Sequence, residues 1–216
     1  LGSRRGPELA QKPFDSLLFD SLYVTRSNDQ GHTWGTPEPF GISSSLDYQS
    51  FGGRTGIIEM PDGTLLLPLE GECAGDLKPN AAPTDNRSRC YVARSYDGGS
   101  TWQHPSLVAL DGINSEIAFG EPAMLRLPGG KLLASLRTDP TRFDDPHPTL
   151  DSEGYVYQAF STDNGWTWHG LRRTLIWGRP AHLLQLRSGR ILCTYGYRRE
   201  PFGVRAVLSE DEGETW

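Results

Sequence analysis

The sequence predicts an all-β protein assembled from repeated four-stranded antiparallel units. Three observations support this prediction: an eight-residue motif occurs four times, a hairpin pattern alternates with it, and no segment has convincing helical periodicity. The composition agrees, because the 216 residues include 25 Gly, 16 Pro and 6 Trp. Glycine-rich turns with aromatic anchors are typical of all-β folds.

The repeated motif reads Ser-x-Asp-x-Gly-x-Thr-Trp. Its copies span 27–34, 95–102, 161–168 and 209–216, and their starts are 68, 66 and 48 residues apart. An alternating apolar run precedes each copy, which indicates a strand entering a hairpin. Within the motif, the Asp can accept hydrogen bonds from backbone N–H groups of the turn, and the Gly can adopt a positive φ. We therefore interpret the four Asp residues as turn-holding rather than catalytic, and we expect each Trp to anchor its unit to a neighbour.

A second pattern, strand–tight turn–strand, alternates with this motif. It occupies 56–68, 123–134 and 182–192, with tight turns at Asp62-Gly63, Gly129-Gly130 and Ser188-Gly189. Each unit then contains four antiparallel strands, which is the blade of a β-propeller. We predict that blade one ends within 1–40, blade two covers 51–110, blade three covers 117–177 and blade four starts near 179. The chain 1–216 is then one propeller domain of about three to four blades, incomplete at both ends.

The strand order sorts the connections onto two faces. The tight turns and the Asp motifs share one face, whereas the longer connections within and between blades share the other. These longer connections are expected at 39–52, 70–88, 111–120, 138–154, 170–179 and 196–202. Long loops concentrate function, so a site is expected on the face opposite the Asp motifs.

Composition and charge exclude several classes of partner and cofactor. The formal net charge of −6 disfavours nucleic acid. No apolar run approaches the roughly 18 residues of a membrane span. No signal peptide is recognisable, although both ends look cut, so the compartment and the oligomeric state stay open. No cluster has metal-ligand spacing, and no cofactor is expected.

Cys73 and Cys90 flank one long loop and could form a disulfide, while Cys193 is expected to be a buried thiol.

The motif copies resemble the Asp boxes of the sialidase (neuraminidase) superfamily. That resemblance implies a six-bladed β-propeller and an exo-α-sialidase-like glycoside hydrolase that releases terminal sialic acid from glycoconjugates. Sialidases carry a Glu at the start of one strand 1 and an Arg at the end of the following strand 2. Glu121 and Arg137 match these positions. The hairpin between them also brings the two side by side, as a site or as a plain surface ion pair.

Further site residues follow from the resemblance alone. It assigns the general acid/base to Asp15, with Asp20 as the alternative, and a second carboxylate-binding Arg to Arg198, with Arg199 as the alternative. Arg54, Glu70 and Glu72 are implied near the pocket, and Tyr195 and Tyr197 as its walls. Apart from the resemblance, His147 and His182 are lone histidines that are either site residues or structural. In the implied mechanism, Glu121 activates a nucleophilic Tyr, while Arg137 and Arg198 hold the substrate carboxylate by bidentate contacts.

The chain also departs from the sialidase pattern. It contains neither the Arg-Ile-Pro stretch that carries the superfamily's first Arg nor the last blade with its nucleophilic Tyr, so the 216 residues alone are expected to be inactive. Two alternatives therefore stay open. One is another carbohydrate-active propeller enzyme, a lyase or hydrolase acting on uronic-acid or other sugars. The other is a non-catalytic propeller that binds glycans or proteins, since the fold does not decide function.

Overall fold

A computed structural model describes residues 22–40, 42–43, 48–52, 56–73, 88–112, 117–140 and 154–216. Every regular element within these ranges is a β-strand, which confirms the predicted all-β class. None of these residues forms a helix of the length and apolarity that a membrane span requires. Asp15, Asp20, Arg54 and His147 lie outside the described residues.

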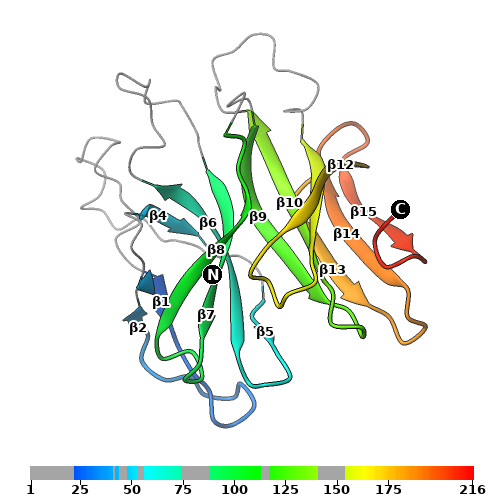
Figure 1. Ribbon diagram of the computed structural model, residues 1–216. Coiled ribbons are helices and arrows are strands. Elements are labelled where there is room, and N and C mark those ends of the chain that lie inside the picture. Colours follow the sequence, from blue (N-terminus) through cyan, green and yellow to red (C-terminus); the bar gives the residue numbers. More distant parts are fainter. Residues whose placement is uncertain are drawn as a thin grey trace, which may run out of the picture.

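The strands form four consecutive sheets (Figure 1). The first is the hairpin β1 (Leu22–Val24) and β2 (Glu38–Phe40). The second contains β4 (Tyr48–Gly52), β5 (Ile58–Glu59), β6 (Leu65–Cys73), β7 (Arg89–Ser95) and β8 (Trp102–Ala109). A short strand, β3 (Ile42–Ser43), adds to β8 in parallel.

The other two sheets repeat the same antiparallel order. The third contains β9 (Ile117–Arg126), β10 (Leu132–Pro140), β11 (Tyr155–Ser161) and β12 (His169–Trp177). The fourth contains β13 (Ala181–Gln185), β14 (Ile191–Tyr197) and β15 (Gly203–Ser209). Strands that follow one another in the chain are hydrogen-bonded neighbours in both sheets, as expected for propeller blades.

The strand register places the Asp boxes and the tight turns on one rim. Leu65 pairs with Ser95, Leu132 with Ser161 and Ile191 with Ser209, so each box starts beside the residue that leaves a tight turn. The far ends of β6, β10 and β14 therefore reach the opposite rim. In Figure 1 the tight turns lie at the lower ends of the sheets, and β10 runs up to the opposite rim.

Each Asp box is closed by the same hydrogen bonds. In the second box, the Ser95 hydroxyl donates to Asp97 Oδ1 over 2.7 Å, and the Thr101 hydroxyl donates to Asp97 Oδ2 over 2.6 Å. The backbone N–H groups of Gly99 and Thr101 donate to Ser95 Oγ and to Asp97 Oδ1. These contacts satisfy backbone donors that the turn would otherwise leave unpaired, which explains the spacing of Ser, Asp, Gly and Thr.

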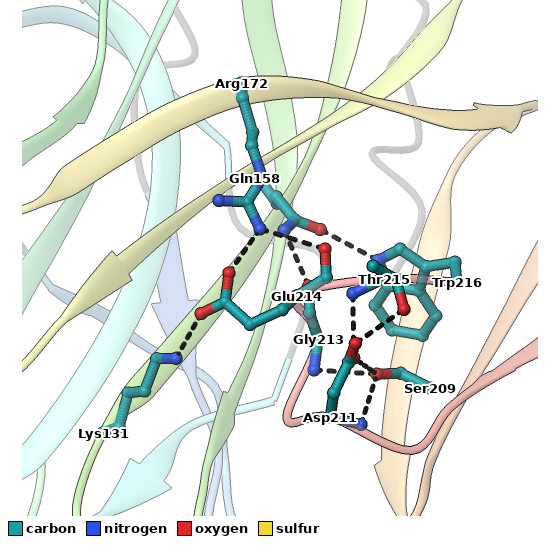
Figure 2. A network of polar contacts seen from close by, with 9 residues as sticks. All are labelled: Lys131, Gln158, Arg172, Ser209, Asp211, Gly213, Glu214, Thr215 and Trp216. Atoms are coloured by element: carbon teal, nitrogen blue, oxygen red, sulfur yellow. Dashed lines mark hydrogen bonds and ion pairs between the residues drawn. The ribbon is translucent and has the colours of Figure 1, made fainter.

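The glycine carbonyl of the second, third and fourth boxes also receives a hydrogen bond from the preceding blade. Arg26 Nη2 donates to Gly99 O over 2.8 Å, and Ser106 Oγ donates to Gly165 O over 2.6 Å. In the fourth box, Gln158 Nε2 donates to Gly213 O over 2.7 Å (Figure 2). The boxes therefore connect neighbouring blades as well as closing their own turns.

The fourth box carries additional contacts to the third sheet, which Figure 2 shows. Trp216 Nε1 donates to Gln158 Oε1 over 2.9 Å. Glu214 lies between two cations, 2.8 Å from Lys131 Nζ and 2.7 Å from Arg172 Nη2. The amide of Gln158 is buried, whereas the ion pairs are partly exposed, so we expect the amide to contribute more to stability.

Three apolar clusters lie against the sheets, and two of them pack on opposite faces of the third sheet. Residues of β10 alternate between them: Leu132 and Leu136 pack toward the second sheet, and Leu133 packs toward the fourth. The three inner strands β9, β10 and β11 are thus buried on both faces, which explains why they are largely apolar, whereas the outer strand β12 is mostly exposed. Fully burying one such leucine contributes about 1.5–3 kcal/mol.

The tryptophans of the boxes pack as anchors in three of the four copies. Trp102, Trp168 and Trp216 contact the apolar clusters. Trp34 differs from this expectation, with 62% of its surface exposed. Its box belongs to the small β1–β2 hairpin, and its indole N–H is satisfied locally by Gly31 O at 3.1 Å.

Cys90 and Cys193 are buried thiols. Cys90 is free and fully buried on β7, so the disulfide with Cys73 that the sequence allowed is not formed. Burial raises the pKa of the Cys90 thiol well above its usual range, and the charges of Glu70 and Glu121 raise it further. Cys193 is buried within β14, as predicted.

Candidate active site on the rim opposite the Asp boxes

Glu121 and Arg137 form an ion pair between adjacent strands. Arg137 Nη1 lies 3.0 Å from Glu121 Oε2, and the Glu121 side chain is only 4% exposed. The register pairs Arg137 with Gly120 and shifts between Ser135 and Arg137. Glu121 lies at this β-bulge with a φ of 41°, a conformation that is rare for residues other than glycine. The bulge thereby turns the Glu121 carboxylate toward Arg137.

The two strands extend beyond this pair on the side of the long loops. β9 starts at Ile117 and β10 ends at Pro140, so the pair lies inside the sheet rather than at the strand ends implied by the resemblance. The longer ladder buries the pair more deeply than a surface contact. The ion pair also belongs to a network of polar contacts that includes residues of three blades.

Glu70 joins this network from the neighbouring blade. The backbone N–H of Glu121 donates to Glu70 Oε2, which comes from β6. Gly120 makes this approach possible, because a Cβ at that position would clash with Glu70 Oε2. The Glu70 carboxylate of one blade thus binds the backbone of Glu121, whose own carboxylate binds Arg137.

Asp139 and Arg179 extend the network toward the fourth sheet. Asp139 Oδ2 lies 2.6 Å from Arg137 Nε, and Asp139 Oδ1 contacts Arg179 Nη1. Arg179 also donates from Nη1 to Thr138 O over 2.9 Å. Acidic and basic groups therefore alternate along the rim, from Glu121 through Arg137 and Asp139 to Arg179.

The pKa shifts of the two arginines reflect these neighbours. Partial burial alone would lower the pKa of Arg137, but the hydrogen bond and charge of Asp139, and then those of Glu121, raise it. Partial burial lowers the pKa of Arg179, and the positive charges of Arg137 and Arg198 lower it further against the opposing effect of Asp139. Arg198 lies two residues after Gly196, whose carbonyl oxygen accepts a hydrogen bond from the Arg179 N–H over 2.9 Å.

The other sequence candidates that the structure describes lie on β6, β13 and β14 or directly after β14. Arg198 and Arg199 follow the end of β14 and are exposed. Glu72 is two residues beyond Glu70 on β6, and His182 is exposed on β13. Tyr195 and Tyr197 lie near the end of β14. Tyr195 packs against the apolar cluster between the third and fourth sheets, and the ring of Tyr197 meets that of Trp177 edge to face.

Sequence reasoning missed Asp139 and Arg179. Arg179 could have been found from the internal repeat, because Gly178-Arg179-Pro180-Ala181 corresponds to Gly120-Glu121-Pro122-Ala123. The same position at the head of consecutive blades thus carries a carboxylate and then a guanidinium. Asp139 is two residues after Arg137, a spacing that places both on one face of a strand.

The arrangement can bind an anion and accept a proton. Arg137 and Arg179 are planar donors suited to carboxylates, while Glu121 and Glu70 provide acceptors. Among the described residues, no group of three or more His, Cys, Asp and Glu could hold a metal ion. The chemistry that these side chains themselves offer is acid–base and electrostatic.

The fold and this rim define an Asp-box β-propeller. A family model described as the BNR repeat-like domain matches residues 16–216, and the chain belongs to that family. A comparison with curated proteins gave no match. The propeller fold of this family is also that of solved sialidases and arabinanases.

Three solved structures illustrate the likeness. A Dyadobacter fermentans protein of unknown function has a TM-score of 0.69 at 25% identity, with 89% of this chain and 50% of that chain covered. A Hadza microbial sialidase has a TM-score of 0.58 at 18% identity, with 91% and 39% covered. A Penicillium chrysogenum α-L-arabinanase has a TM-score of 0.58 at 19% identity, with 89% and 56% covered. The chain thus spans about half the length of these proteins, and the likeness to the two enzymes is one of fold.

Proposed function

We propose that this chain forms part of a glycoside hydrolase of the sialidase type, with its site on the rim that carries Glu121 and Arg137. The observation that carries the proposal is the 3.0 Å ion pair between these residues, held by a bulge opposite the Asp boxes. In the sequence, this carboxylate and this guanidinium occupy the positions of the pair by which the chain resembles sialidases. The substrate is then a glycoconjugate that ends in sialic acid.

The roles follow from the chemistry of each group. Arg137 would bind the substrate carboxylate through its planar fork, and Arg198 would contribute from the next blade. Glu121 would take the proton of a tyrosine nucleophile, because attack by a carboxylate would bring two negative charges together. Asp15 is proposed as the acid/base for the leaving group, and Arg54 as a further substrate contact.

One observation favours a second candidate. Asp139 binds both Arg137 and Arg179, so a substrate carboxylate has to compete with a carboxylate of the protein itself. A neutral sugar carries no carboxylate, so a hydrolase could bind it without displacing Asp139 from the two arginines. The second candidate is therefore a propeller hydrolase for another sugar, with Glu121 retained as an acid–base group.

A panel of reporter glycosides tests the proposal on the full-length protein. Hydrolysis of a fluorogenic α-sialoside that is lost in Glu121→Gln would support the sialidase-type function. Hydrolysis of an α-L-arabinofuranoside reporter instead would support the second candidate. Hydrolysis of neither, with retained binding of a sialylated oligosaccharide, would identify a non-catalytic glycan-binding propeller and overturn the proposal.

Glu210→Gln is the matched control for this panel. Glu210 carries the same charge on the Asp-box rim, where it lies 3.9 Å from Arg190 and is 80% exposed. Its substitution should leave every reporter activity unchanged. A loss of activity in both variants would indicate a general effect of removing a carboxylate.

A further inference from the structure

Arginines and aromatic residues alternate on the site rim, between the third and fourth blades. We define the arginine–aromatic ledge as Trp177, Tyr197, Arg199 and Arg205, which come from the end of β12, the end of β14, the following loop and β15. The Trp177 and Tyr197 rings meet edge to face, with centroids 5.4 Å apart. The ledge therefore joins three segments of the chain, at residues 177, 197–199 and 205, whose side chains contact one another.

Each ring of the ledge is covered by a guanidinium. The Arg199 Cζ lies 3.7 Å from the Trp177 ring centroid, and the Arg205 Cζ lies 3.3 Å from that of Tyr197. Stacking of this kind orients the guanidinium plane and lowers the entropy lost when its N–H groups bind a ligand. The ledge thus presents a stacked cation over one face of each ring.

The basic character continues on both sides of the ledge. Tyr155 pairs with Trp177 in the sheet, and the Arg173 Cζ lies 4.7 Å above the Tyr155 ring. On the other side, Arg198 precedes Arg199 and acts on Arg179 of the candidate site. A chain with a net charge of −6 thus gathers several of its cations at one place.

The ledge is fixed to the candidate site by the backbone. The N–H of Arg179 donates to Gly196 O over 2.9 Å, and the N–H of Gly178 donates to Gly154 O over 3.1 Å. Gly178 has no room for a side chain, because a Cβ would lie 2.5 Å from Tyr195 Cδ2. A ligand bound at Arg137 could therefore continue over Arg179 and Arg198 onto the ledge.

We propose that the ledge binds the anionic groups of an extended glycan, carboxylates or sulfates on sugar units beyond the one held at Glu121 and Arg137. The ring faces that Arg199 and Arg205 occupy are closed to a neutral sugar or a nucleic-acid base, since both would stack on open aromatic faces. Continuity with the site rim favours a glycan over an acidic peptide. The inference rests on the proposed function, because it extends the same substrate.

Binding measurements on the full-length protein test this inference without relying on turnover. Dextran, carboxymethyl dextran and dextran sulfate oligosaccharides of equal length share one backbone and differ in their charged groups. Calorimetric titration should show binding of at least one charged probe and no binding of neutral dextran. The charged arm that binds distinguishes carboxylate from sulfate recognition.

Two double variants locate the binding. Arg199→Ala with Arg205→Ala should weaken binding of the charged probe about tenfold, since loss of about 1.4 kcal/mol of binding free energy is a factor of ten. Arg187→Ala with Arg190→Ala removes the same charge from the Asp-box rim and should leave the affinity unchanged. Added salt should weaken binding to the ledge, because exposed charges are screened.

Several outcomes would overturn the inference. Equal weakening by both double variants would show that only net charge matters, and tight binding of neutral dextran would exclude recognition of anions. Poly-glutamate binding as tightly as the charged dextrans would reassign the ledge to an acidic peptide. Absence of reporter hydrolysis with intact binding of the charged dextrans at the ledge would instead contradict the proposed function and leave anion binding at the ledge supported.

Discussion

Arg137 contacts Glu121 although its partner in the sheet is Gly120. The 3.0 Å contact exists because the bulge in β9 inserts one residue and turns Glu121 into a φ of 41°. Such backbone conformations cost about 1–3 kcal/mol and persist only where the surroundings enforce them. Here the Glu121 N–H is bound by Glu70 and the Glu121 carboxylate by Arg137. Strain of this kind, placed next to charged groups, is common at functional sites.

Asp139→Asn should increase affinity for carboxylate ligands. Asp139 is an internal anion that binds both Arg137 and Arg179, and the amide would remove one of the negative charges that offset these two guanidinium groups. We expect the Kd for free sialic acid to fall about tenfold, equivalent to about 1.4 kcal/mol. Calorimetry measures this directly, and weaker or unchanged binding would show that Asp139 does not compete with the ligand.

Gly178→Ala should destabilise the rim between the third and fourth blades. The added Cβ would lie 2.5 Å from Tyr195 Cδ2 and 2.6 Å from Gly196 O, at a φ of 144°. We expect a loss of about 2–4 kcal/mol in the free energy of unfolding, measured by denaturant titration.

Gly189→Ala is the control for this change. Gly189 also has a positive φ, of 86°, but a Cβ added there would have no other atom within 4 Å on the turn. Its substitution should cost about 1 kcal/mol from backbone strain alone. Equal losses for the two variants would contradict the steric explanation.

Gln158→Leu should destabilise the protein more than Glu214→Ala. Gln158 is 1% exposed, and its loss leaves Gly213 O and Trp216 Nε1 without their partner. We expect about 1–3 kcal/mol for this change. Glu214→Ala removes two partly exposed ion pairs, which together contribute about 0.5–1 kcal/mol. Thermal melting of both variants under one condition shows which substitution lowers the melting temperature more. A larger decrease for Glu214→Ala would show that the exposed ion pairs are the stronger connection between blades.

The Asp boxes should stabilise the fold without taking part in chemistry. Asp97→Ala removes the hydrogen bonds that close the second box, so the melting temperature should fall while turnover per folded molecule stays normal. An unchanged melting temperature with abolished turnover would reverse this interpretation.

The same boxes predict how stability depends on acidity. The hydroxyl and then the backbone N–H of the box threonine lower the pKa of Asp29 and of Asp211 from 3.8 to about 2. A pKa lowered by folding stabilises the protein above the unfolded value and loses that contribution as pH falls through the folded value. Melting temperature should therefore drop between about pH 4 and about pH 2, and the deficit of Asp211→Asn should shrink over that interval. A constant deficit would exclude linkage to this carboxylate.

Local patterns were sufficient to predict the blades. Two interleaved hairpin repeats determined the strand order, and the Asp-box spacing located one rim, because turn chemistry depends on residues close in sequence. The pairing of Glu121 with Arg137 also followed from the length of one hairpin. These features depend on short-range geometry that a single sequence contains.

The rest of the site depends on contacts between blades. The Glu70 contact with the Glu121 backbone and the ion pair of Asp139 with Arg179 join residues more than thirty positions apart. Their identification requires the packing of neighbouring sheets. The bulge at Glu121 was equally invisible, because it depends on the register between β9 and β10.

The kinetics of Glu121→Gln in the full-length protein test the central claim most directly. The amide keeps the size of the side chain but cannot accept the proton, so kcat should fall about 100-fold or more while KM changes little. Arg137→Lys should instead act mainly on binding, because a point charge replaces a two-pronged donor. Normal kcat and KM in Glu121→Gln would contradict the account and leave the rim opposite the Asp boxes without a catalytic role.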